Sequence, residues 1–166
     1  MEKLEWVKNI FGGSLTILRS GETVGQINWN NIFSSKAQAR FRGKTFYITR
    51  DIWASRLEVL DAKDQSLLAR LAINPFSPRS EVILNGKRFE LEMKNFWQSG
   101  WSWKFNRNEI ITFISNEFIS RDKGNIELFS ACNEEVEILI LLGLALRSHF
   151  ILVILILLAA ALLVIL

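Results

Sequence analysis

Short runs of alternating apolar and polar residues, separated by turn signals at regular intervals, occupy the chain from about residue 3 to residue 130. The clearest run is EVILNGKRFELEM, in which Asn85 and Gly86 supply the two positive-φ positions of a type I′ hairpin turn. Side chains alternate between the two faces of a strand, so pairing across this turn creates one apolar face. That face contains Val82, Leu84, Phe89, Leu91 and Met93. The pattern predicts an antiparallel meander.

A second hairpin follows the same rule in AQARFRGKTFYIT, with its turn at Arg42 and Gly43. Further turns are predicted at residues 20–22, 61–64, 106–108 and 122–124. With a first strand near residues 4–7, the count reaches about twelve strands, more than an open twisted sheet usually carries. Closure removes exposed strand edges. We therefore expect a mainly β fold, a closed antiparallel barrel, with the proline-containing residues 74–80 as a loop within it.

The apolar pattern changes at Asn133, a residue type that often caps the N-terminus of a helix. Glu134, Glu135 and Glu137 follow in the first turn, where carboxylates interact favourably with the helix dipole. Beyond them the sequence is apolar on every side. A helix of this kind must be buried all round, in a protein core or in lipid.

The lengths predict where this helix leaves the barrel. Strands of six or seven residues make a wall of roughly 20–23 Å, which a helix crosses in about 14 residues. Counted from Asn133, the crossing ends at Arg147. The remaining residues 150–166 are all apolar and rise ~26 Å, at the short end of what crosses a bilayer. We expect a barrel at residues 1–132, a central helix threaded through it at 133–147, and a transmembrane or anchoring segment at 148–166.

The position of Arg147 favours this register over one longer span. A span that began at Ile138 would bury Arg147 in the membrane at a cost of roughly 2.5–3.5 kcal/mol. The first residues carry acidic Glu2 and Glu5 and contain no apolar run typical of a signal peptide. The sequence thus predicts a membrane protein with a single C-terminal anchor and a cytoplasmic barrel. The alternative is a soluble barrel in which the whole apolar run is one buried helix.

Several segments, in this order, resemble the tubby C-terminal-like superfamily, which includes the phospholipid scramblase-like and LURP-one-related proteins. The similar segments are SRLEVLDAKDQSLLAR, VILNGKRFEL, WSWKF and EEVEILILLGLAL. The resemblance implies a twelve-stranded barrel with a hydrophobic helix along its axis. It also implies association with lipid or membranes.

Charge and composition argue against several functional classes. Lys and Arg number 20 against 17 Asp and Glu, with both signs interspersed, so we expect no nucleic-acid partner. Cys132 is the single cysteine and excludes an intrachain disulfide. The sequence shows no glycine-rich phosphate loop, Cys/His cluster or nucleophile motif. We therefore expect no enzyme activity, no cofactor and no metal site.

Basic residues are the candidates for contact with anionic phospholipid. Lys36, Arg40 and Arg42, with Lys44 at the rim, would form a stripe on one strand face, and Arg147 would lie at the headgroups. The alternative for the stripe is an ordinary solvated face. Trp101 and Trp103 would either pack inside the barrel or lie at a membrane interface.

Together these features predict a membrane-anchored, non-enzymatic barrel module that binds lipid or a protein partner of unknown identity at the cytoplasmic face. The alternatives are lipid translocation of the scramblase type and a fully soluble barrel.

Overall fold

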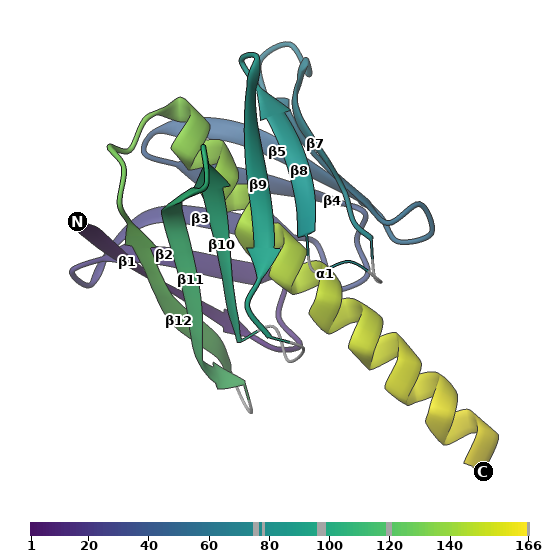
Figure 1. Ribbon diagram of the computed structural model, residues 1–166. Coiled ribbons are helices and arrows are strands. Elements are labelled where there is room, and N and C mark those ends of the chain that lie inside the picture. The colour runs from purple at the N-terminus through teal and green to yellow at the C-terminus, as the bar shows by residue number, and fades with distance from the viewer. Residues whose placement is uncertain (75–76, 78, 96–98, 119–120, 166) are drawn as a thin grey trace.

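The computed structural model describes residues 1–74, 77, 79–95, 99–118 and 121–165. These residues form a mainly β protein with twelve strands and one helix, in which consecutive strands pair as a meander (Figure 1). The strands are β1 (Glu2–Asn9), β2 (Ser14–Arg19), β3 (Glu22–Trp29), β4 (Lys36–Phe41), β5 (Lys44–Asp51), β6 (Arg56–Asp61), β7 (Leu67–Ala72), β8 (Arg79–Leu84), β9 (Lys87–Met93), β10 (Gly100–Phe105), β11 (Asn108–Phe118) and β12 (Arg121–Leu128). The helix is α1 (Glu134–Ile165).

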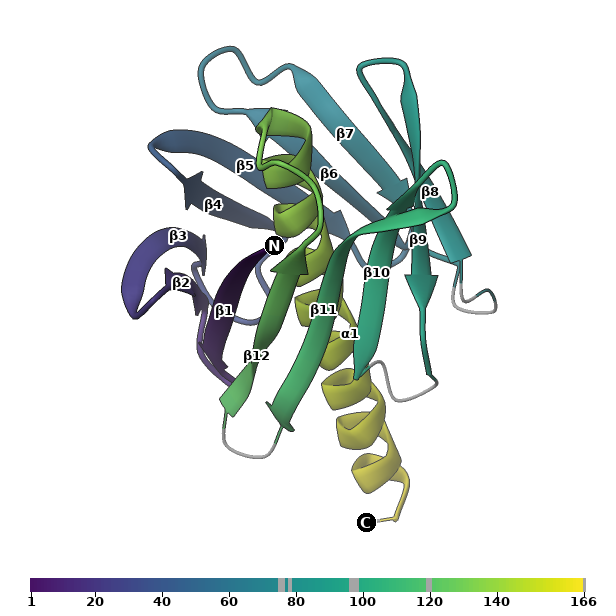
Figure 2. The same ribbon diagram turned by 60° about the vertical axis from the view of Figure 1, so that its left-hand side comes forward.

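The sheet curls into a nearly closed barrel around the helix (Figure 2). Its strand order is β7-β6-β5-β4-β3-β2-β1-β12-β11-β10-β9-β8, and every ladder is antiparallel. Pairing of β1 with β12 joins the two ends of the meander, which leaves β7 and β8 as the first and last strands of the order. These two strands lie next to each other, so the barrel has one seam between them.

The predicted hairpin turns are confirmed where glycine and asparagine mark them. Asn85 and Gly86 have φ values of 49° and 74°, and Arg42 and Gly43 have 48° and 82°. These are the positive values that a type I′ turn requires. The predicted apolar faces point into the barrel, where they form most of the core together with the helix.

The predicted turn at residues 122–124 is wrong, because these residues lie inside strand β12. Asp122 is fully buried and Gly124 pairs opposite Trp6 of β1. A Cβ on Gly124 would lie 2.3 Å from the indole of Trp6 and 2.1 Å from the carbonyl oxygen of Ile114, so only glycine fits there. Asp122 and Gly124 are residue types typical of turns, but here one is buried inside the barrel and the other allows close packing of Trp6. The connection at residues 119–120 lies outside the described residues, as does part of the predicted loop at 74–80.

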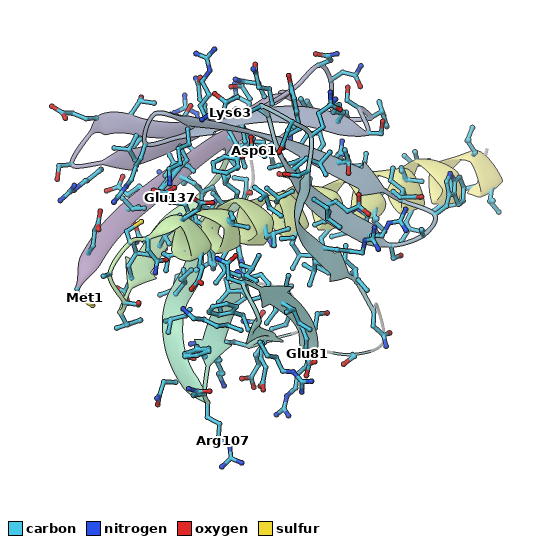
Figure 3. The ribbon with its side chains drawn as sticks, turned by 90° about the horizontal axis from the view of Figure 1, so that it is seen from above. Met1, Asp61, Lys63, Glu81, Arg107 and Glu137 are labelled. Carbon is cyan, nitrogen blue, oxygen red and sulfur yellow. The ribbon has the colours of Figure 1, made fainter. Side chains whose placement is uncertain are left out.

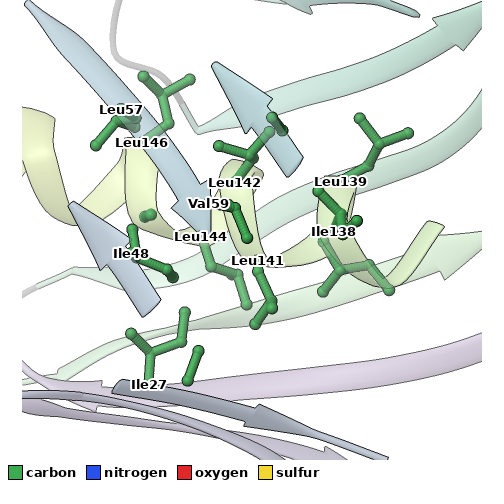
Figure 4. Packing of buried hydrophobic residues seen from close by; sticks show 14 of the residues in the cluster. Ile27, Ile48, Leu57, Val59, Ile138, Leu139, Leu141, Leu142, Leu144 and Leu146 are labelled. Atoms are coloured by element: carbon green, nitrogen blue, oxygen red, sulfur yellow. The ribbon is translucent and has the colours of Figure 1, made fainter. Parts of the chain in front are cut away.

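The start of α1 agrees with the sequence. The backbone N–H of Val136 donates to Oδ1 of Asn133 at 3.0 Å, which is the predicted N-cap. From there the helix runs through the barrel and packs against apolar side chains of the wall. Figure 4 shows this packing, with helix residues such as Leu142 and Leu144 against Ile48 and Val59 of the strands.

The helix leaves the barrel later than the sequence arithmetic predicts. Burial continues past Arg147 to Ile151 and Leu152, so the buried part rises roughly 25 Å. The reason is the height of the wall. Strands β1, β3, β5 and β12 have eight residues instead of six or seven, which corresponds to ~26 Å at 3.3 Å per residue.

Gly143 of the helix contacts the ring of Phe113 in β11, and a Cβ there would lie 2.5 Å from the ring. We expect Gly143→Leu to lower the free energy of unfolding by ~1–3 kcal/mol, because overpacking displaces the ring or the helix. Urea unfolding of the full chain in mild detergent measures this. Leu142→Met is the matched control and should cost less than about 1.5 kcal/mol. Equal stability of the two variants would show that the helix approaches the wall less closely than described.

Candidate functional site

The two ends of the barrel differ in chemistry. We call the end where α1 begins the entry end and the end where it leaves the exit end. Strand β1 runs from the entry end, where Glu2 pairs with Leu128, to the exit end, where Asn9 pairs with Arg121. In a meander successive connections alternate between the ends. The connections at residues 10–13, 30–35 and 52–55 therefore lie at the exit end, beside the emerging helix (Figure 1).

Beyond the exit end, residues 153–165 continue the helix into solvent. We call them the projecting segment. They consist only of valine, isoleucine, leucine and alanine, and they rise about 20 Å. Exposure reaches 77% at Leu163 and 87% at Val164. By length and composition, α1 is a candidate membrane-crossing helix. An exposed apolar surface of this extent is typical of a membrane or protein contact.

A buried polar cluster lies just inside the exit end. We call Lys8, Arg50, Asp122 and Arg147 the exit cluster; all four side chains are buried. Nε of Arg147 lies 3.4 Å from Oδ1 of Asp122 and forms an ion pair with it. Nη2 of Arg147 lies 3.5 Å from Oγ of Ser115. The helix is thus tied to β12 and β11 immediately before it leaves the barrel.

Burial dominates the electrostatics of the cluster. It raises the pKa of Asp122, although the neighbouring Arg147 and Lys8 oppose this shift. It lowers the pKa of Arg50 to about 10 and also lowers the pKa of Lys8. The cluster thus contains three basic side chains, those of Lys8, Arg50 and Arg147, and one carboxyl group, that of Asp122. A pocket of about 10 Å³ between Lys8, Arg50 and Ser148 has room for roughly one water molecule.

The two strand-borne cations hold the exit loops. Nζ of Lys8 donates to the carbonyl oxygens of Asn9 and Ile10, both at 3.2 Å. Nε of Arg50 donates to the carbonyl oxygen of Ser34 at 2.8 Å, and its Nη2 donates to that of Ile32. The Arg50 guanidinium also stacks 4.0 Å over the ring of Trp29. Hydrogen bonds from charged donors are about twice as strong as neutral ones, so these contacts fix the loop backbone at the rim.

The predicted basic stripe runs along the outer wall, from Lys36 at the exit-end start of β4 to Arg42 and Lys44 at the entry end. Lys36 and Arg40 are exposed on β4, with Nζ of Lys36 4.2 Å over the Tyr47 ring. Arg42 and Lys44 lie at the entry end. Arg40 and Arg42 both line a surface pocket of about 360 Å³ on β3 to β5. Lipid binding by the stripe stays a prediction.

The entry-end members of the stripe are occupied by acidic partners. Arg42 forms an ion pair with Glu2. Nζ of Lys44 lies 3.2 Å from Glu134 and 3.3 Å from Glu137, in the first turn of the helix. The hydrogen bond that Lys44 donates to the Glu134 carboxylate is the main reason why the pKa of Lys44 is raised. Figure 3 shows Glu137 at this end, far from the projecting segment.

The structure corrects the position of Arg147, which the sequence places at the lipid headgroups. Arg147 lies inside the barrel and pairs with Asp122. The wall is taller than six- or seven-residue strands would make it, so the polar residues 147–149 fall within it. Ser148 and His149 are buried as well.

Of the two readings of Trp101 and Trp103, packing inside the barrel is confirmed. The Trp101 ring stacks on Phe113 at 5.0 Å and lies 5.6 Å from that of Trp6. Among the tryptophans that the structure describes, Trp53 is exposed; it lies in the exit loop at residues 52–55, with 97% exposure. Phe11 and Phe33, in the other two fully described exit loops, are 76% and 64% exposed. The sequence analysis missed these three residues.

Comparisons of the chain with protein-family models, with curated proteins and with solved structures find no match. The resemblance to the tubby C-terminal-like superfamily therefore stays a prediction, and the geometry alone supports the function proposed below.

Proposed function

We propose that this protein is a membrane-anchored, non-enzymatic barrel module that binds lipid or a partner protein at the cytoplasmic face. The observation that carries the proposal is the projecting segment, which continues a helix packed in the barrel and exposes apolar side chains on all sides. The barrel end of that helix is secured by the core and by the Arg147–Asp122 ion pair. The anchor is thus rigidly attached to the module.

The free energy of insertion favours this placement. The projecting segment contains ten large aliphatic residues and three alanines. At −0.3 to −0.6 kcal/mol for each large residue, insertion gains roughly 3–6 kcal/mol. In water the same surface would drive aggregation.

The distribution of charge supports a cytoplasmic barrel. Lys8, Arg50 and Arg147 lie directly behind the point where the helix emerges. Positive charge beside a membrane span is typical of the cytoplasmic side. Ligand or partner binding would then use the outer wall, where Arg40 and Arg42 line the surface pocket on β3 to β5.

Carbonate extraction of membranes tests the anchor. The full chain should remain in the membrane pellet. Leu158→Lys combined with Leu162→Lys should move it to the supernatant, because each lysine costs about 2.5–3.5 kcal/mol in the bilayer core. Leu158→Ile with Leu162→Ile is the matched control and should stay in the pellet.

Release of the unsubstituted chain by carbonate would overturn the proposal. If cross-linking then joined two copies of this chain through the projecting segment, the segment would bind a second copy and not lipid. Protease added outside sealed, right-side-out vesicles tests on which side of the membrane the barrel lies. Protection of the barrel agrees with the cytoplasmic placement, and its digestion contradicts it.

A further inference from the structure

We infer that the exit end of the barrel is itself a membrane-docking surface, in which Phe11, Phe33 and Trp53 enter the interface of the leaflet that receives the helix. We call these three residues the aromatic rim. The inference rests on the proposed function and adds to it the orientation and depth of the barrel. Its occupant is the lipid bilayer.

The first observation is the absence of any polar spacer between barrel and anchor. Leu152 is buried at the mouth of the barrel, while Ile154, two residues later, is already 46% exposed. Between residues 150 and 165 the sequence contains no polar side chain, and the polar residues 147–149 lie inside the wall. Immersing this apolar surface in hydrocarbon therefore brings the headgroup region up to the exit end.

The second observation is the chemistry of the loops that surround the emerging helix. The three fully described exit connections, at residues 10–13, 30–35 and 52–55, each carry one member of the aromatic rim, exposed by 64% or more. Phenylalanine and tryptophan are large apolar residues, and tryptophan is enriched where the membrane meets water. In water alone, three such side chains at one end of a barrel would leave a large apolar area exposed.

The entry end provides the contrast. Its described hairpin turns carry small and polar residues, among them Gly21, Gly43, Lys63, Asn85 and Arg107, while Phe129, in the connection from β12 to the helix, is 51% exposed. Figure 3 shows Lys63 and Arg107 in the half of the view that contains Glu137, opposite the half into which the helix projects. Both ends consist of connections of the same meander. The difference in loop residues therefore correlates with the end at which the helix leaves the barrel.

The third observation is that the rim loops are held in shape. Lys8 and Arg50 bind the backbone carbonyl groups of loops 10–13 and 30–35 from inside the barrel. The N–H of Phe33 donates to Oδ1 of Asn31 at 2.8 Å, and the N–H of Ala54 donates to Oδ1 of Asp51 at 2.9 Å. These side chain to backbone bonds are turn-forming contacts. The aromatic rim is thus presented by an ordered surface.

Quenching of a fluorophore at the rim tests the inference with the full chain. In a Cys132→Ser background, Ala54→Cys places a label beside Trp53, and Lys63→Cys places the control label at the entry end. Both proteins are reconstituted into vesicles of phosphatidylcholine and phosphatidylserine. We expect the label at residue 54 to be quenched by iodide several-fold less than the label at residue 63.

A second variant ties the protection to the aromatic side chains. Phe11→Ser, Phe33→Ser and Trp53→Ser, combined with Ala54→Cys, should restore much of the quenching, while carbonate extraction still leaves the protein in the pellet. All three residues are exposed, so the barrel should keep its melting temperature.

Equal quenching at residues 54 and 63 in protein that resists carbonate would overturn the inference and leave the anchor intact. Protection that the triple variant does not reduce would also overturn it, because the aromatic side chains would then play no part. Protein that carbonate releases would remove both the anchor and the docking surface.

Discussion

A chain that ends at Leu152 is expected to fold with a melting temperature close to that of the full protein, and to remain in solution without detergent. The projecting segment makes up the part that is lost, and its residues are mostly exposed. A chain that ends at Arg147 is expected to unfold or aggregate. It lacks Ile151 and Leu152, which are both buried at the exit end.

The expected loss of stability in the chain that ends at Arg147 follows from the burial of the two missing side chains. Removing a large buried aliphatic side chain typically costs ~2–5 kcal/mol. Two such losses approach the whole stability of a domain, about 5–15 kcal/mol. Thermal melting followed by circular dichroism, with sedimentation to detect aggregates, measures both chains.

A chain that ends at Ile156 is the matched control for the new terminal carboxylate. It should behave like the chain that ends at Leu152. If the chain that ends at Arg147 melted at the same temperature as these two, residues 148–152 would contribute nothing to the core and the helix would leave the barrel at Arg147.

Arg147→Met is expected to lower the free energy of unfolding by about 3–5 kcal/mol at neutral pH, because it leaves the buried carboxylate of Asp122 without its ion-pair partner. Asp122→Asn in the same chain should recover much of this loss, since the amide carries no charge. Arg88→Met, which breaks the exposed pair between Arg88 and Glu81, should change stability by only about 0–1 kcal/mol.

The pH dependence of Arg147→Met provides a further check. Burial raises the pKa of Asp122 above its ordinary value, and loss of the Arg147 charge should raise it further. The folded state then binds a proton more readily than the unfolded state, so stability falls as pH rises from about 4 towards the higher folded pKa. Urea unfolding across this range should show a decline that is steeper than in the unsubstituted chain and absent from the double variant. Equal stability of Arg147→Met and Arg88→Met at neutral pH would rule out the pair as a structural tie.

The predictable part of this fold has local causes. Asn85-Gly86 and Arg42-Gly43 adopt turns because their own backbones favour positive φ, and Asn133 caps the helix through its own side chain. The barrel followed from the strand count. At Asp122 and Gly124 the same local rules failed, since the carboxyl group serves an ion pair with Arg147 and the glycine makes room for Trp6. Those partners lie far away in the sequence.

The aromatic rim was missed although its signal is present. Once a meander is predicted, its connections can be assigned alternately to the two ends of the barrel. NIFGG, NNIFSS and DIWAS then belong to one end, while RSGE, FRGK and LNGK belong to the other. Sorting the loops by end, and not only by turn type, separates exposed aromatic residues from those of the core. Residue type alone could not predict that Trp53 is exposed and Trp101 is buried.

The seam between β7 and β8 bears on how the barrel assembles. All twelve strands precede the helix in the chain, and the helix fills the interior that the strands enclose. A finished barrel would present a closed ring through which an apolar helix with a long extension had to pass. A sheet that remains open at β7 and β8 can instead wrap sideways around the helix, because these strands are the two ends of the ladder order. The seam therefore gives the sheet a route around the helix that requires no threading of the apolar segment through a closed ring.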